Sequence, residues 1–205
     1  MADPPPGMRW QGTNGVVVAV PEDWETSTDP CWGGSGPIVR FLSRAALAMG
    51  CLLRADRPDA ALLVASNQAV GRFLAGDLSS RTGVGGVEVL SSRLRCRPRP
   101  IGPCFLTFAV PSRDATFQVT YRGPHPRRYV QGLRASVTRV PSGYTMVPIV
   151  RYGRSDATAV RLLEAAGLTA EVPDVDFPHY VTGTVPPAGT PVPAGAVVRL
   201  TVGDG

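Results

Sequence analysis

The fold of the C-terminal sixty residues is decided by residues 155–168, which read SDATAVRLLEAAGL. Apolar side chains recur in this stretch at i, i+3, i+4 and i+7, namely at Ala159, Leu162, Leu163 and Ala166. That spacing places them on one face of an α-helix. We therefore predict an amphipathic helix of about 11 to 12 residues, an ordinary length for a globular domain.

Both ends of this helix carry recognisable signals. Ser155 is suited to the N-cap, and the carboxylate of Asp156 suits the positive end of the helix dipole. Gly167 stands where a left-handed residue commonly ends a helix. Leu168 can then fold back on Leu163, which is the hydrophobic contact of a Schellman ending.

Strands are predicted after the helix at residues 169–172, 181–185 and 197–202. In the last of these, Val198, Leu200 and Val202 alternate with polar residues, as expected for a half-buried strand. Residues 186–190 read PPAGT and predict a turn, because Pro fixes φ and Gly permits positive φ. The prediction for this segment is one helix packed on a short antiparallel sheet.

Residues 146–205 resemble the PASTA domain, the module associated with penicillin-binding proteins and bacterial serine/threonine kinases. The matching pieces, in order, are Val147-Pro148, residues 155–168, Gly183-Thr184-Val185, Pro187-Ala188-Gly189-Thr190, Pro193-Ala194-Gly195 and residues 198–202. The resemblance implies an extracytoplasmic module that binds peptidoglycan or muropeptides.

The resemblance has departures in its loops. Ile149 follows Val147-Pro148 where the family usually has Asp, and the stretch between the second strand and the turn is shorter than usual. The loop before the helix carries Arg151, Tyr152 and Arg154, which could meet a peptide carboxylate or a sugar ring. The alternative is that these three residues are ordinary surface.

The 205 residues are long enough for two modest domains. We expect residues 1–7 to be a tail or spacer, residues 8–144 a basic, mostly β domain, and residues 145–205 the PASTA domain, giving an α+β chain. Strand candidates of the first domain are residues 15–20, 59–65, 86–94, 104–110, 116–122 and 133–140, and residues 38–53 suit either a helix or a strand. This arrangement resembles uncharacterised actinobacterial envelope proteins, a likeness that assigns no activity.

The chain contains no lysine, and all 21 of its basic residues are arginine. A P-loop, a kinase phosphate-binding lysine, a pyridoxal Schiff base and the Ser-x-x-Lys pair of penicillin-recognising enzymes are therefore excluded. His125, His179 and Ser35 are the remaining candidates for catalysis, and their surroundings favour loops or surface. We expect a non-enzymatic protein without catalytic residues, metal or cofactor.

Residues 1–145 hold 17 arginines against 10 acidic residues, so the basic excess belongs to the first domain. Four of these arginines alternate along the sequence, at Arg93, Arg95, Arg97 and Arg99. On a strand they would project from one face and bind phosphate or carboxylate. The alternative is a solvated face whose like charges prevent edge pairing. No motif or stacking platform predicts nucleic acid.

Four cysteines, Cys31, Cys51, Cys96 and Cys104, lie in the first domain without a Cys-x-x-Cys pair, so zinc is not predicted. Beside a PASTA-like module we expect disulfides, although three connectivities are open; nearest-neighbour pairing would join Cys31 to Cys51 and Cys96 to Cys104. Buried thiols are the alternative.

No run of 18 apolar residues occurs, and the first residues lack the apolar core of a signal peptide. We nevertheless expect an exported cell-envelope protein whose signal or anchor is not in this sequence. Its expected partner is peptidoglycan, with anionic wall polymers or a wall-associated protein as further candidates. The competing hypotheses are an ectodomain that docks on a wall enzyme or kinase, and a wall hydrolase.

Overall fold

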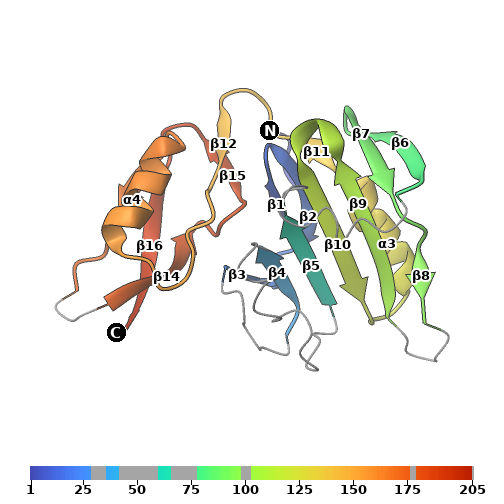
Figure 1. The fold of residues 1–205 in the computed structure, drawn as a ribbon, viewed down its shortest axis with the longest axis horizontal. Helices are drawn as coiled ribbons and strands as arrows, with labels where there is room; N and C mark the ends of the chain where they lie inside the picture. Colours follow the sequence, from blue (N-terminus) through green and yellow to red (C-terminus); the bar gives the residue numbers. More distant parts are fainter. Residues whose placement is uncertain (29–35, 42–59, 66–77, 98–102, 176–178, 205) are drawn as a thin grey trace.

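A computed structural model describes residues 1–28, 36–41, 60–65, 78–97, 103–175 and 179–204. Buried apolar side chains form two clusters: one in the N-terminal part (residues 1–143), which Ala188 joins from the other part, and one in the C-terminal part (residues 144–204). The two parts lie side by side, with α4 at one end of the molecule and α3 at the other (Figure 1).

The N-terminal part is built on an eight-stranded sheet. Its strands are β3 Glu25–Ser27, β4 Ile38–Phe41, β5 Ala60–Ala65, β6 Ser80–Val84, β7 Val87–Ser91, β8 Arg95–Cys96, β9 Cys104–Val110 and β10 Ala115–Tyr121. Their order is β3-β4-β5-β10-β9-β7-β6, and β8 pairs with β9 beyond the end of β7. The pairs β3–β4 and β4–β5 are parallel, whereas the other pairs are antiparallel.

A second, three-stranded sheet is formed by β1 Met8–Thr13, β2 Val16–Pro21 and β11 Thr138–Arg139. Asn14 and Gly15 connect β1 to β2 with φ of 52° and 74°, as a two-residue type I′ hairpin requires. Helix α3, Pro126–Ala135, contacts β2, β9 and β10. Its Val130 and Leu133 are buried in the first cluster, so the helix joins the two sheets.

The core of the large sheet follows from alternation along β9 and β10. Phe108 on β9 stacks on Phe117 of β10 with ring centroids 5.2 Å apart, and both side chains are fully buried. On the side of the sheet that faces α3, Tyr121 stacks on Tyr129 at 3.9 Å, and Trp24 stacks on Tyr129 at 6.1 Å. These rings close the core at the amino end of α3.

The C-terminal part contains β12 Tyr144–Met146, α4 Asp156–Ala165, β13 Thr169–Glu171, β14 His179–Val185, β15 Pro191–Pro193 and β16 Val197–Asp204. Helix α4 packs on the sheet β13-β16-β14, and β12 pairs with β15 beside it. The α+β class, with a helix on a small sheet in this segment, is confirmed. One detail differs from expectation: β13 pairs with β16 in parallel, so the sheet is mixed.

The helix ends are confirmed in detail. Gly167 has φ of 72°, the N–H of Leu168 donates to the carbonyl of Leu163 at 3.0 Å, and the N–H of Gly167 donates to Glu164 at 2.9 Å. This is the hydrogen-bond pattern of a Schellman motif. Ser155 is the N-cap residue, but its side chain makes no cap hydrogen bond; its hydroxyl lies 3.1 Å from that of Thr158.

The prediction of a strand over residues 133–140 is wrong. Residues 133–135 end α3, and β11 is limited to Thr138–Arg139. Val130, Leu133 and Val137, all buried, are spaced at i, i+3 and i+7, a helical period that the flanking arginines and Gly132 obscure. The strand predicted over residues 86–94 is shorter, since β7 ends at Ser91. Residues 42–53 lie outside the described residues, whereas residues 38–41 form β4.

Two adjacent leucines of α4 give a matched test of the second cluster. Leu163 is fully buried and Leu162 is 39% exposed. We expect Leu163→Ala to lower the free energy of unfolding by about 2–5 kcal/mol, because it leaves a cavity. Leu162→Ala should cost well under this, and urea unfolding followed by circular dichroism measures both. Equal losses would contradict the packing described for α4.

The burial of Tyr129 predicts that the free energy of unfolding falls at alkaline pH. Burial raises the pKa of Tyr129 above its ordinary value of 10.0, and nearby Tyr121 and Asp23 raise it further. The folded protein therefore keeps this proton at a pH where the unfolded chain has released it. The resulting stability is present below pH 10.0 and is lost as the pH rises above that value. Tyr129→Phe cannot ionise, so its free energy of unfolding should fall less between neutral and strongly alkaline pH, as measured by urea titrations; an equal fall would contradict this assignment.

Candidate functional site

The loop that precedes α4 is held against the start of β14. The N–H of Gly153 donates to the carbonyl of Val181 at 2.9 Å, and the N–H of Val181 donates to Arg154 at 2.9 Å. This antiparallel bridge brings Tyr152 beside Tyr180. Their rings meet edge to face with centroids 5.0 Å apart, and their hydroxyl oxygens are 2.6 Å apart.

The Tyr152–Tyr180 pair is open to solvent on one side. The Tyr152 side chain is 45% exposed, and Arg151 and Arg154 on either side of it in sequence are also exposed. We call these four residues, Arg151, Tyr152, Arg154 and Tyr180, the tyrosine site. Tyrosine offers an apolar ring with a polar tip, and guanidinium groups bind carboxylates through paired hydrogen bonds. The site can therefore stack against a sugar ring and neutralise a carboxylate.

His179, one residue before Tyr180, anchors this end of β14 to the helix. Its Nε2 lies 2.7 Å from Oδ2 of Asp156, the first residue of α4. Both side chains are largely buried, and the helix amino terminus stabilises the carboxylate. His179 thus ties the residue next to Tyr180 to the start of α4. His125 is exposed at the N-cap of α3, and Ser35 lies outside the described residues.

Three residues of this site, Arg151, Tyr152 and Arg154, were predicted from the sequence, whereas Tyr180 was not. Tyr180 is separated from Tyr152 by the whole of α4 and β13, so no short motif joins them. Their surroundings in the sequence share no signal, because Tyr152 lies between Arg151 and Gly153 whereas Tyr180 lies between His179 and Val181. The pairing of Arg154 with Val181 was needed to bring them together.

At the other end of β14, the turn 186–190 is docked on the N-terminal part. The side-chain amide of Gln11 donates to the carbonyl of Ala188, and the N–H of Gly12 donates to the carbonyl of Gly189 at 2.9 Å. Gln11 is fully buried, and Ala188 belongs to the first cluster with Phe41. We call this contact the seam.

Gly189 is required at the seam by both conformation and space. Its φ is 77°, and a Cβ there would lie 2.3 Å from Cζ of Phe41 and 2.5 Å from the carbonyl oxygen of Gly12. A side chain would therefore force the two parts of the molecule apart.

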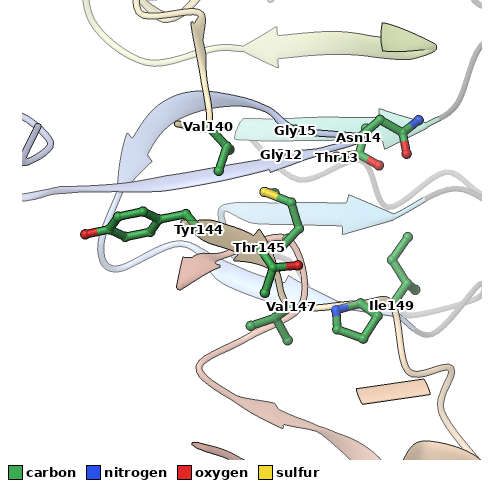
Figure 2. Close-up of a pocket in the computed structure, with 12 residues that line it drawn as sticks. Gly12, Thr13, Asn14, Gly15, Val140, Tyr144, Thr145, Val147 and Ile149 are labelled. Atoms are coloured by element: carbon green, nitrogen blue, oxygen red, sulfur yellow. The ribbon is translucent and has the colours of Figure 1, made fainter. Parts of the chain in front are cut away.

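Beside the seam, a cleft of about 430 Å³ lies between the β1–β2 hairpin and the β12 segment (Figure 2). Its lining residues are all uncharged, and Figure 2 shows Tyr144, Thr145 and Val147 along one wall.

Three of the four arginines predicted to form a stripe lie on or directly beside β8. Arg93, Arg95 and Arg97 are exposed, whereas Leu94 and Cys96 between them are half-buried. Arg99 lies outside the described residues. Only residues 95 and 96 of this segment form a strand, yet the alternation of exposed and inward side chains continues on both sides of it.

Cys96 and Cys104 form a disulfide between paired residues of β8 and β9. Cys31 and Cys51 lie outside the described residues. Within the described ranges, no group of three or more His, Cys, Asp or Glu side chains is arranged to hold a metal ion. A helix long and apolar enough to cross a membrane is likewise not found among the described residues.

The C-terminal part is thus a small α+β module whose exposed loop and first strand residues meet at one end. Residues 145–204 match the family model of the PASTA domain, so this segment is a PASTA domain, a class of binding domain. Neither a curated protein nor a solved structure matches the chain.

The seam can be tested with two glycines of equal backbone strain. Gly189 and Gly195 have φ of 77° and 79°, but a Cβ on Gly195 would meet nothing within 4 Å. We expect Gly195→Ala to cost about 1–2 kcal/mol in free energy of unfolding, from its backbone alone. Gly189→Ala should cost about 1–3 kcal/mol more, because it is also overpacked. Urea unfolding measures both; equal costs would contradict the seam.

Proposed function

We propose that this chain is a non-enzymatic, extracytoplasmic protein of the cell envelope that binds peptidoglycan through its PASTA domain. The observation that supports this proposal most directly is the tyrosine site. There, two aromatic rings from separate segments are in contact and are flanked by two exposed arginines. Peptidoglycan presents both sugar rings and stem-peptide carboxylates, which match these two kinds of group.

The seam supports this placement of the ligand. Tyr180 and Val185 stand at opposite ends of β14, about 17 Å apart at roughly 3.3 Å per residue. The end near Val185 leads into the turn that docks on the N-terminal part. The end near Tyr180 faces solvent, so a bulky wall polymer can reach it.

We further propose that residues 8–144 and 145–205 are two domains, with residues 1–7 as a spacer. The two hydrophobic clusters, which divide along this boundary except for Ala188, and the start of the family match at residue 145 support this division. Tyr144, the last residue of the first domain in this division, pairs with Pro193 of the second, so the two domains follow one another almost directly along the chain. The seam then sets their relative orientation.

A second candidate is an ectodomain that docks on a wall enzyme or kinase. It is favoured by apolar side chains exposed on the PASTA domain, among them Val185 at 55% and Val197 at 57%. Protein interfaces bury such side chains, whereas a polysaccharide gains little from them. The two candidate functions therefore differ in which substitutions should weaken binding: those in the tyrosine site for peptidoglycan, and those at the exposed apolar side chains for a protein partner.

The test is sedimentation of the full chain with purified peptidoglycan from which anionic polymers have been removed. We expect Tyr152→Ala to weaken binding about tenfold, because loss of one aromatic stacking contact corresponds to about 1.4 kcal/mol. Arg151→Gln with Arg154→Gln should weaken it several-fold through loss of charge-assisted hydrogen bonds.

The matched control is Arg161→Gln with Arg199→Gln, which removes the same charge from exposed positions of the same domain. This control should bind as the parent does. If the parent protein does not sediment, or if all variants sediment equally, wall binding at the tyrosine site is excluded. If Val197→Ser instead loses binding to a wall enzyme or kinase but still binds peptidoglycan, the result supports the second candidate function.

A further inference from the structure

The exposed side chains of Arg93, Arg95 and Arg97, which we call the arginine row, lie in line along the edge of β9. Leu94 and Cys96 between them pack on the first hydrophobic cluster, so the three arginines are turned to the opposite side. On extended backbone, alternate residues are separated by about 6.6 Å, at roughly 3.3 Å per residue. The row is therefore a linear array of cations and not a point cluster.

The row is held on a rigid support. The N–H of Ser92 donates to Thr107 at 2.8 Å, and the N–H of Arg97 donates to Pro103 at 3.2 Å. Between these bonds the disulfide joins Cys96 to Cys104. The guanidinium of Arg97 lies over the ring of Phe105, 5.9 Å from its centroid. A segment tied at both ends loses little conformational entropy when a ligand binds.

In the part of the chain that the structure describes, no carboxylate is paired with the row. None of its three arginines forms an ion pair within the described residues. Glu88 on the adjacent β7 is already bound to Arg81 at 3.2 Å, and Asp114 follows the opposite end of β9. The positive potential of the row is therefore available to an anion in solution.

We propose that the arginine row binds a linear polyanion with one phosphodiester in each repeat, extended along β8. The spacing of the row is comparable to the repeat of an extended phosphodiester chain, and guanidinium groups bind phosphate through paired hydrogen bonds. The site belongs to the N-terminal part and is separate from the tyrosine site, so the proposal does not depend on peptidoglycan binding.

Two other anionic partners fit the surroundings less well. A lipid surface also takes apolar side chains, and within the described residues the exposed large apolar side chains all lie between Ile149 and Val197, in the C-terminal part. Single-stranded nucleic acid needs exposed aromatic rings for stacking, and the ring beside the row, Phe105, is partly buried beneath Arg97.

The experiment measures binding of the full chain to a synthetic, linear glycerol-phosphate oligomer over a series of salt concentrations. We expect the oligomer to bind at least tenfold more tightly than monomeric glycerol phosphate. For three phosphate contacts, a plot of the logarithm of the association constant against the logarithm of the salt concentration should have a slope of about −2. The triple variant Arg93→Gln, Arg95→Gln, Arg97→Gln should lose at least tenfold in affinity and most of this slope.

The matched control is the triple variant Arg113→Gln, Arg139→Gln, Arg161→Gln, whose three arginines are exposed elsewhere. It has the same net charge and should keep the parent affinity within about twofold. Both variants should unfold within about 0.5 kcal/mol of the parent, as is usual for surface positions. A difference between them then reports on the row and not on folding or net charge.

Several outcomes would overturn the proposal: an oligomer that binds no more tightly than the monomer, equal losses in the two triple variants, or a parent affinity unchanged in the row variant. Tenfold tighter binding of single-stranded DNA of equal charge, or of vesicles containing anionic lipid, would assign the row to those partners instead. Because the peptidoglycan used for the tyrosine site is free of anionic polymers, either proposal can fail without the other.

Discussion

The buried amide of Gln11 and the side-chain-free Gly189 bring the two parts of this molecule into one structure. The Gln11 amide satisfies the carbonyl of Ala188, and the methyl group of Ala188 completes a cluster of residues that otherwise belongs to the N-terminal part. No residue other than glycine fits between Phe41 and the carbonyl of Gly12. The orientation of the PASTA domain is therefore set by a close backbone contact and not by the short connection alone.

This contact determines which surfaces remain for ligands. One end of β14 leads into the seam, so the loop before α4 and the start of β14 form the exposed end of the PASTA domain. The arginine row lies on the other part of the molecule, on and beside β8, which pairs with β9 and lies away from the PASTA domain (Figure 1). A chain fixed in this way carries the aromatic surface, proposed to bind sugar, and the cationic surface, proposed to bind phosphate, on two different parts of the molecule.

The sequence predicted those elements whose signals are local. Helix α4 carries its own ending, since Gly167 and Leu168 close it through hydrogen bonds to the last turn. Strand β9 was predicted with its observed bounds, because its apolar run lies between turn residues. Helix α3 was missed, because its Val130 and Leu133 are separated by polar residues and its burial depends on sheets at both sides. The bounds of an element whose stability comes from tertiary packing are poorly encoded nearby.

The features of the candidate sites also fall into two groups, those predicted from the sequence and those formed only by the fold. The sequence by itself determined the PASTA domain, the alternation of Arg93, Arg95 and Arg97, and the absence of lysine, because each is a matter of residue type and spacing. The tertiary structure alone decided that Tyr180 joins Tyr152, that Cys96 pairs with Cys104, and that Gly189 meets Phe41. These contacts depend on strand pairing and on close packing between segments. Neither of these produces a periodic pattern in the sequence from which the contact could be predicted.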